Sequence, residues 1–305
     1  MTLGILCPGQ GAQHPDMLSM LGGEPAAEAV LAAAQAVLGR DLQQLVSQGG
    51  DEIHRNVVAQ PLLCASQLAT WSALRDRLPA PRVFAGYSVG ELAAYACAGA
   101  LNAREVVDLA RRRAGAMDRA CPEPSGLLAV RGITRERLTP LCRRHRVEIA
   151  IVNDVDRLVV GGRSADLIGF QQEVSGLGAG ITPMMVSIAS HTSLLNDAVP
   201  EFAALLGGSG LQAPVVPVLA GIDGGPVFTR QRAVDTLSRQ IARTVQWAAC
   251  IESLRETGCT VLLELGPSNG LSRMVRDRYP DLAVRSVAEF RSLQGVAEWV
   301  GRQGP

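Results

Sequence analysis

The sequence is poor in aromatic residues, carries no formal net charge and contains no CxxC pair of cysteines. Phe, Trp and Tyr make up 4% of the chain, so aliphatic side chains must fill the core that a hydrophobic content of 47% predicts. Lys and Arg number 29, as do Asp and Glu, so the formal net charge is zero. No global positive field draws the protein to nucleic acid or to an anionic membrane, and we expect neither as a partner.

The cysteines are seven in number, scattered along the chain, and no two of them form a CxxC pair. An odd and dispersed set argues against a disulfide framework and against a zinc site, so we expect no metal. No apolar run reaches the length of about 20 residues that a membrane-spanning helix needs. Segment 1–7 lacks a basic start and is interrupted by Pro8-Gly9, which is typical of a first strand rather than of a signal peptide. We expect a cytoplasmic protein.

Strand-like and helix-like patterns alternate along the chain, which predicts an α/β architecture. The 305 residues are enough for a large domain with a smaller one inserted. In the middle of the chain the predicted order is β-α-β-β-α-β, which is the ferredoxin-like arrangement. Its strands are expected at 127–130, 148–152, 158–160 and 182–187, and its helices at 135–145 and 165–177. We therefore place a small domain at 125–189, inserted in a discontinuous large domain made of 1–124 and 190–305.

The strongest chemical motif is the GxSxG pentapeptide Gly86-Tyr87-Ser88-Val89-Gly90. A predicted strand at 82–85 precedes it and a predicted helix follows it, which is the setting of a nucleophile elbow. Its glycines allow a tight turn that presents the serine hydroxyl beyond the end of the sheet. The helix N-terminus and the amide of Val89 could then stabilise negative charge on a substrate oxygen. Ser88 is therefore the candidate nucleophile.

A nucleophilic serine needs a base, and the chain contains four histidines. His54 lies in a polar stretch, and His145 lies among arginines. His14 follows the first turn, where it could line the cleft, although a surface loop is the more common setting for such a residue. His191 falls at a predicted strand-to-helix junction where the small domain rejoins the large one. Elimination therefore favours His191 as the base.

Two further features distinguish the chain from an ordinary hydrolase. The turn Pro8-Gly9-Gln10-Gly11-Ala12-Gln13 follows the first predicted strand and could present a second amide to an oxyanion. It is not a dinucleotide-binding fingerprint, because His14 stands where the third glycine should be. The triplet Arg111–Arg113 lies on a predicted helix, whose consecutive residues point about 100° apart. One guanidinium of the triplet could thus face a cleft and bind a carboxylate.

Six motifs, in this order, resemble those of the malonyl-CoA:acyl carrier protein transacylase family. They are PGQGAQ (8–13), GYSVGE (86–91), the downstream arginine, Ser190-His191, VQW (245–247) and ELGP (264–267). The resemblance covers nearly the whole chain. It implies an α/β-hydrolase-like large domain with a ferredoxin-like insert. It also implies transfer of malonyl from malonyl-CoA to the pantetheine-type thiol of an acyl carrier protein, with no metal or redox cofactor.

The resemblance also implies roles for individual residues. Ser88 would be the nucleophile and His191 its base, with the amides of Gln10 and Val89 as the oxyanion hole. Arg113, matched through the pattern Arg113-x-x-x-Met117, would bind the malonyl carboxylate. Gln246 resembles the glutamine that helps to hold the histidine. A backbone carbonyl at or beside Asn269, instead of an acid, is expected to orient the imidazole.

Two departures from the family pattern bear on which acyl group is transferred. Tyr87 replaces the histidine that most members carry before the serine, and Ile188-Ala189-Ser190-His191 is not the common malonyl-type tetrapeptide. With GYSVGE, the chain looks most similar to the epsilon subunit of malonate decarboxylase. The alternatives are a malonyl or acyl transacylase of fatty-acid or polyketide synthesis, a transferase for a neutral acyl group, a serine thioesterase, and a non-catalytic subunit that docks a carrier.

Overall fold

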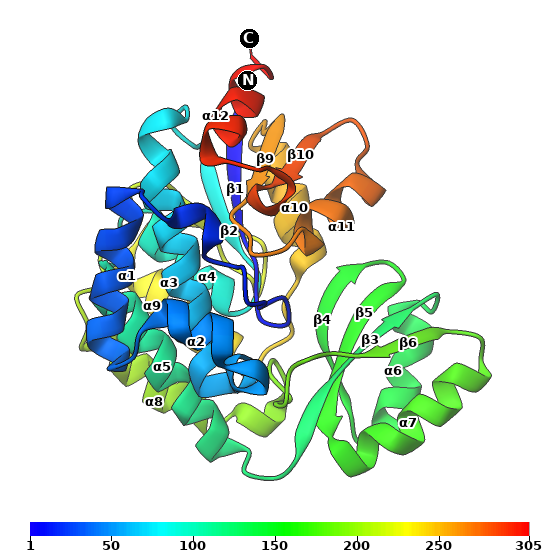
Figure 1. Ribbon diagram of the computed structural model, residues 1–305. Coiled ribbons are helices and arrows are strands. Elements are labelled where there is room, and N and C mark those ends of the chain that lie inside the picture. The colour runs from blue at the N-terminus through cyan, green and yellow to red at the C-terminus, as the bar shows by residue number, and fades with distance from the viewer. Residues whose placement is uncertain (305) are drawn as a thin grey trace.

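The computed structural model describes residues 1–304 and contains two β-sheets, each with its own hydrophobic core. Figure 1 shows the large sheet surrounded by helices, with the second sheet and its two helices lying apart in a smaller green lobe. The labelled chain ends lie together at the opposite end of the molecule from that lobe. The α/β architecture with a ferredoxin-like insert is confirmed.

The large sheet has six strands in the order β10-β9-β1-β2-β7-β8. Their bounds are β1 Leu3–Cys7, β2 Val83–Gly86, β7 Val218–Leu219, β8 Pro226–Val227, β9 Val261–Glu264 and β10 Ala283–Ser286. All pairs are parallel except β7 with β8, and Ile5 of β1 lies between Phe84 and Leu263. Every residue of β1, β2 and β9 is buried, as expected for parallel strands covered on both faces.

Helices cover this sheet, and α3 is the most deeply buried of the long ones. The large-domain helices are α1 Pro25–Leu38, α2 Leu42–Gln48, α3 Asn56–Leu74, α4 Val89–Cys97, α5 Ala103–Ala120, α8 Ala198–Gly207, α9 Arg230–Gln240, α10 Trp247–Glu256, α11 Gly270–Arg278 and α12 Leu293–Gly301. Figure 1 shows α1, α3 and α5 side by side on one flank of the sheet. The helix α5 begins with a complete capping box between Asn102 and Glu105.

The small domain is a four-stranded antiparallel sheet in the order β4-β5-β3-β6. Its elements are β3 Ser125–Arg131, α6 Arg135–Arg144, β4 Glu148–Asp154, β5 Arg157–Arg163, α7 Ser164–Gly176 and β6 Gly180–Pro183. The edge strand β4 is extended by a bridge between Ile151 and Val245 of the large domain, where the Val152 amide donates to the Val245 carbonyl over 2.8 Å. This bridge anchors the small domain against the segment between α9 and α10.

Several elements differ from their predicted bounds. The expected strand 182–187 is instead β6, which ends at Pro183, and an irregular segment leads on to His191. The helix expected at 62–78 begins six residues earlier, at Asn56, with Pro61 inside it. The helices α2 and α12 were not predicted, because short surface helices carry a weak periodic signal. Among the described residues, none of the helices has both the length and the apolar character that crossing a bilayer requires.

Candidate active site

Ser88 lies at a sharp turn between β2 and α4 and has a backbone conformation that is rare for a residue with a side chain. Its φ is 57° and its ψ is −124°, outside the regions that serine normally occupies. Such strain persists only where the surrounding structure imposes it. Ser88 is the N-cap residue of α4, so its hydroxyl lies beyond the carboxyl end of the sheet and beside a helix N-terminus.

Packing explains the two glycines of the pentapeptide. A Cβ added at Gly86 would lie 2.1 Å from the backbone of Glu91, and one added at Gly90 would lie 2.1 Å from the carbonyl oxygen of Cys7. Neither backbone can yield, because α4 sits directly against β1 and β2. The elbow therefore requires glycine on both sides of Ser88.

The turn 8–13 packs against the elbow. A Cβ at Gly9 would lie 3.3 Å from the Cβ of Ser88, and the Gln67 side chain on α3 holds the Pro8 carbonyl over 2.8 Å. Within residues 1–304, the amides of Gln10 and Val89 donate to no other protein group. Val89 directly follows Ser88, and Gln10 directly follows Gly9 in the turn that packs on the elbow, so these two uncommitted amides belong to the two segments that meet at Ser88. Two such donors are what an oxyanion hole needs.

His191 meets Ser88 through its Nε2 atom, which lies 2.8 Å from the serine Oγ. Its Nδ1 atom lies 2.6 Å from the backbone carbonyl oxygen of Gln240. A carbonyl can only accept a hydrogen bond, so Nδ1 carries the proton and Nε2 is left as the acceptor for the serine hydroxyl. The imidazole is therefore held in the form that removes a proton from Ser88, and its orienting partner is a carbonyl.

The end of α9 explains how a carbonyl can take this role. The last carbonyls of a helix have no partner within the helix, and the macrodipole makes that end negative. His191 binds the carbonyl of Gln240, the last residue of α9, and its backbone amide donates to the next carbonyl, that of Ile241, over 2.8 Å. This contact helps to hold His191 at a φ of 65°, a conformation unusual for histidine. The same negative helix end would stabilise the imidazolium that forms when Ser88 loses its proton.

His191 is buried, with 1% of its surface exposed. Burial, together with the nearby charge of Arg113, lowers the pKa of His191 from its ordinary 6.5 to about 3, although the bond to Gln240 acts in the opposite direction. A lowered pKa means that the neutral imidazole, which is the form that acts as a base, is populated at every pH above about 3. The free enzyme therefore holds an active base across the whole neutral range.

A pH profile tests this state of His191. We expect the rate at which S-acetyl-N-acetylcysteamine acetylates the enzyme to stay constant within about twofold from pH 5 to pH 8. This donor has no ionisable group, so the profile reports the enzyme alone. The measurement is the initial rate of adduct formation by mass spectrometry. An acid limb centred near 6.5, the ordinary value for histidine, would contradict the assignment.

Arg113 on α5 is buried, with 2% of its surface exposed, and it forms no ion pair within residues 1–304. One Nη atom donates to the Gln60 side chain over 2.7 Å and the other to the Gln240 side chain over 3.1 Å. Burial lowers the pKa of Arg113 to about 10, so the guanidinium stays charged at neutral pH. A buried cation whose partners are neutral amides is rare, and it has further N–H groups for an anion.

Gln240 connects these groups and was missed by the sequence analysis. Its carbonyl accepts from His191, its side-chain oxygen accepts from Arg113, and its side-chain nitrogen donates to the Ser88 carbonyl over 3.0 Å. The sequence does contain a signal for this residue, because Gln240 is a polar residue on the same helix face as the apolar Ala233 and Leu237. A polar side chain on a buried helix face indicates a specific hydrogen-bonding role.

The assignment of Gln246 as the residue that holds the histidine is therefore wrong. Gln246 is the N-cap residue of α10, where its backbone N–H donates to the Gly221 carbonyl over 2.7 Å. The VQW motif instead contributes Trp247, which packs edge-on against Tyr87 with the ring centroids 5.3 Å apart. Five residues separate Gln240, the last residue of α9, from Gln246, so the carbonyl that His191 contacts lies at the end of one helix and Gln246 at the start of the next.

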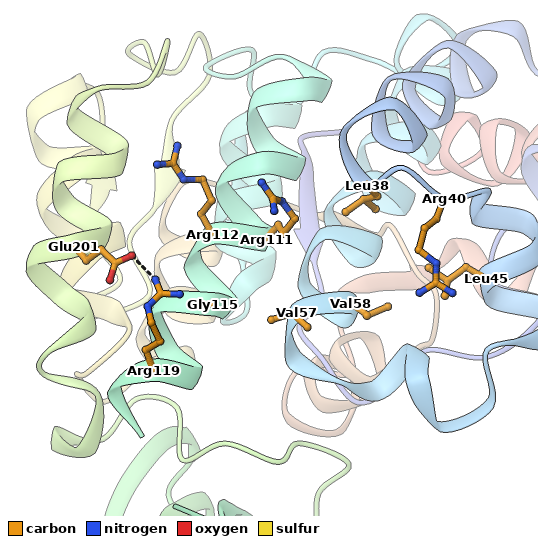
Figure 2. A pocket seen from close by; sticks show the side chains of 10 residues that line it. All are labelled: Leu38, Arg40, Leu45, Val57, Val58, Arg111, Arg112, Gly115, Arg119 and Glu201. Atoms are coloured by element: carbon orange, nitrogen blue, oxygen red, sulfur yellow. Dashed lines mark hydrogen bonds and ion pairs between the residues drawn. The ribbon is translucent and has the colours of Figure 1, made fainter. Parts of the chain in front are cut away.

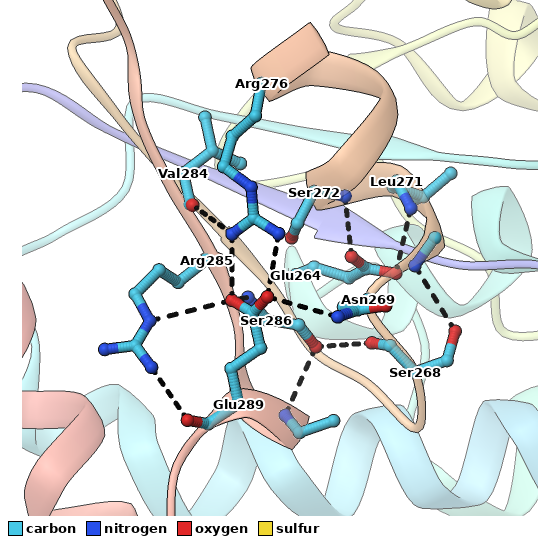
Figure 3. Close-up of polar contacts among 12 residues, drawn as sticks. Glu264, Ser268, Asn269, Leu271, Ser272, Arg276, Val284, Arg285, Ser286 and Glu289 are labelled. Atoms are coloured by element: carbon cyan, nitrogen blue, oxygen red, sulfur yellow. Dashed lines mark hydrogen bonds and ion pairs between the residues drawn. The ribbon is translucent and has the colours of Figure 1, made fainter. Parts of the chain in front are cut away.

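The expectation of an orienting carbonyl beside Asn269 is also wrong. Figure 3 shows the Asn269 side chain bound to Glu289, at a distance of 3.1 Å, within a network around Arg276 and Ser286. A carbonyl of this loop does face a histidine, but the pair is Pro267 O and His14 Nε2, 3.1 Å apart. The loop and His14 line a cavity of 450 Å³ that does not include Ser88 or His191.

The outer face of α5 carries a separate groove of 560 Å³, shown in Figure 2. Arg111, Gly115 and Arg119 line it, with Arg119 bound to Glu201 of α8. These residues recur every four positions, whereas Arg113 lies about 200° around the helix from Arg111. The arginine triplet is therefore divided: Arg113 points inward to Gln240, and its neighbours line the outside.

Taken together, the geometry suits covalent acyl transfer. Ser88 has a neutral base in hydrogen-bond contact, the elbow and the turn 8–13 packed on it carry two uncommitted amides, and one residue, Gln240, links the base to a buried guanidinium. Such a site can form an ester on serine, stabilise the oxyanion, and hold a carboxylate on the acyl group.

Comparison with known proteins agrees with this reading. The acyl transferase domain family matches residues 5–296. A malonyl CoA-acyl carrier protein transacylase of Mycobacterium bovis is 33% identical, over 96% of this chain and 100% of its own. MCAT from Mycobacterium tuberculosis superposes with a TM-score of 0.90 at 32% identity, covering 97% of this chain and 100% of its own.

A second solved structure is a malonyl-transacylase in complex with a type II PKS acyl-carrier protein. It superposes with a TM-score of 0.92 at 28% identity, covering 98% of this chain and 99% of its own. Similarity in sequence and in structure thus extends over both domains. The chain belongs to the acyl transferase domain family.

Proposed function

We propose that this protein transfers a malonyl group from malonyl-CoA to the thiol of an acyl carrier protein, through an ester on Ser88. The observation that supports this most is a buried guanidinium without a carboxylate partner, connected through Gln240 to the Ser88–His191 pair. The family relatives named above are malonyl transacylases, and one of them was solved with its carrier.

In the first half-reaction, the Ser88 hydroxyl attacks the thioester carbonyl and its proton passes to Nε2 of His191. The developing oxyanion is stabilised by the amides of Gln10 and Val89. The C–S bond then breaks, and His191 returns the proton to the departing CoA sulfur. The products are malonyl-Ser88 and free CoA, and the site is again neutral at His191.

In the second half-reaction, the carrier thiol gives its proton to His191 and attacks the ester carbonyl. The C–O bond breaks, and His191 protonates the Ser88 oxygen, which restores the enzyme. Throughout, Gln240 holds the imidazole, and Arg113 holds the malonyl carboxylate. The scheme uses only these side chains and amides, with no metal or redox cofactor.

We further propose that the protein is the transacylase subunit of malonate decarboxylase, which loads a small dedicated carrier subunit. The support is the GYSVGE sequence, in which Tyr87 takes the place of the usual histidine. Tyr87 is nearly buried and packs on Trp247, so this substitution changes the wall beside Ser88. The alternative is a transacylase of fatty-acid or polyketide synthesis, which the named relatives favour.

Discharge of the malonyl-enzyme tests the choice of carrier. Enzyme loaded on Ser88 is mixed with a malonate decarboxylase carrier subunit or with a fatty-acid acyl carrier protein, and the loss of adduct is followed by mass. We expect the decarboxylase carrier to discharge the ester at least about tenfold faster.

Each other outcome has a definite meaning. A faster discharge by the fatty-acid carrier would overturn the subunit assignment and support the alternative. Release of free malonate at the same rate with and without a carrier would contradict transfer itself and indicate a thioesterase. Each carrier lacking its prosthetic thiol serves as the control and should leave the adduct intact.

A further inference from the structure

A second buried charge lies beside the site and has no role in the scheme above. Glu91, on the first turn of α4, has no exposed surface. Its Oε2 atom accepts from the Gln240 side chain over 2.6 Å and from the Gly221 amide over 2.9 Å. Its Oε1 atom is buried and has no hydrogen-bond partner within residues 1–304. A buried, half-bonded carboxyl group is costly and calls for an explanation.

Gln240 places this carboxyl group one amide away from Arg113. The Gln240 nitrogen donates to Glu91, and the Gln240 oxygen accepts from Arg113 over 3.1 Å. The three side chains form a continuous chain of hydrogen bonds, and each of the three residues is at most 2% exposed. An ionised Glu91 therefore balances the Arg113 charge across the amide while the acyl site is empty.

Binding a carboxylate at Arg113 disturbs this balance. The buried network would then contain one positive charge and two negative charges, and like charges in a poorly screened interior cannot both stay ionised at low cost. The substrate carboxylate would contact the guanidinium directly, whereas Glu91 reaches it only through Gln240. Glu91 is thus the group that takes up a proton, and its free Oε1 atom is the position where that proton is held.

We propose that Glu91 is protonated when the acyl carboxylate pairs with Arg113, so that loading of a malonyl group, but not of a neutral acyl group, takes up one proton. This inference rests on the proposed function, because it requires Arg113 to bind the carboxylate. Glu91 acts on the acyl group through Gln240 and Arg113, and it is a positioning residue for the guanidinium.

The titration range of Glu91 agrees with this role. Burial raises the pKa of Glu91 to about 7, against the opposing effects of Gly221, Gln240 and Arg113. Near neutral pH, a small change in the local charge is therefore enough to change its protonation. A second negative charge at Arg113 raises this pKa further, and the coupling must act equally on the affinity for that charge.

The other titratable groups around Glu91 do not take its place. Asp223, in the turn after β7, raises the pKa of Glu91 slightly but is itself paired with Arg232. Tyr95 on α4 and Cys250 on α10 have pKa values raised by burial and stay neutral. The helix α5 also packs on α4, and its charged residue that acts on Glu91 is Arg113. The elements α3, β1, β2 and β7 contain no charged residue, and burial raises the pKa of the α3 thiol, Cys64, to about 12.

The test compares malonyl-CoA with acetyl-CoA between pH 6 and pH 9. The rate constant for loading Ser88 is measured by mass for each donor, and their ratio is used, because CoA ionisation and His191 affect both donors alike. In the wild type we expect the malonyl-to-acetyl ratio to fall by up to about tenfold per pH unit above pH 7, as uptake of one proton requires. In Glu91→Gln, which keeps an acceptor for Gln240 and cannot ionise, the ratio should not change with pH.

Glu264→Gln is the matched control. Burial raises the pKa of Glu264 to about 7 as well, but its carboxylate binds the amides of Leu271 and Ser272 at the start of α11 (Figure 3). The malonyl-to-acetyl ratio of Glu264→Gln should change with pH in the same way as that of the wild type. A flat profile in the wild type, or the same slope in Glu91→Gln as in the wild type, would overturn the proposal.

A second measurement covers the case in which Glu91→Gln does not fold. Net proton uptake is measured when wild-type enzyme is loaded in weak buffer at pH 8, first with malonyl-CoA and then with acetyl-CoA. The difference should be about one proton per site, and a difference of zero would overturn the proposal. Failure of the proposed function looks different: Arg113→Ala would then leave the malonyl-to-acetyl ratio unchanged at every pH.

Discussion

Replacing His191 with alanine is expected to slow the acylation of Ser88 by about 10²- to 10⁴-fold, the range typical of a positioned general base. The expectation follows from geometry: Nε2 lies 2.8 Å from the serine Oγ, and the Gln240 carbonyl fixes the tautomer that leaves this atom free. In the part of the chain that the structure describes, the imidazole bonds to a carbonyl instead of a carboxylate, and it is the base in contact with the Ser88 hydroxyl. The measurement is the single-turnover rate of adduct formation from malonyl-CoA.

The control is His145→Ala. His145 is also a histidine in contact with an acceptor, but its Nε2 atom lies 2.6 Å from Glu173 in the small domain. That variant should acylate at the wild-type rate. An acylation rate in His191→Ala within about tenfold of the wild type would contradict the role of this residue as the base.

Replacing Arg113 with alanine should lower malonyl loading by about 10²- to 10³-fold while acetyl loading survives or rises. Truncating one partner of a buried, hydrogen-bonded charge pair costs about 2–5 kcal/mol, and each 1.4 kcal/mol is a factor of ten. An acetyl group has no carboxylate, so its loading does not depend on an ion pair with Arg113. The loading rates for the two donors are compared by mass, so the expected result is a reversal of preference and not a general loss of activity.

Arg112→Ala is the matched control for this experiment. It removes the neighbouring guanidinium of the same triplet, which lies on the outer face of α5 (Figure 2). Arg112 pairs there with Asp108, and both side chains are exposed to solvent. Its malonyl-to-acetyl preference should equal that of the wild type. Equal losses for both donors in Arg113→Ala would indicate a structural role for Arg113 and contradict carboxylate recognition.

The sequence predicts best what is determined locally. Ser88 can be identified because the elbow needs glycine at 86 and 90, and contacts of 2.1 Å show why no side chain fits there. The fold follows from the alternation of short apolar strands with helices, and the ferredoxin-like insert from its order of elements. His191 could be selected because the chain has only three other histidines.

Contacts between distant segments were harder to predict. Which of three adjacent arginines faces inward depends on the rotation of α5, and only the family resemblance singled out Arg113. The sequence does not predict the role of Gln240, because that role depends on its place as the last residue of α9. There its carbonyl has no partner within the helix, and its side chain contacts two other helices. Asn269 was misassigned for the same reason, since nothing in the sequence shows which loop carbonyl meets which histidine.

The most direct test of the account is the intact mass of the protein after brief mixing with malonyl-CoA, with Ser88→Ala as the control. The account predicts an added mass of one malonyl group on the wild type, no added mass on the variant, and loss of the adduct when a carrier thiol is supplied. A malonyl adduct of equal yield on Ser88→Ala, or release of CoA without any adduct or acylated carrier, would contradict an acyl-enzyme on Ser88.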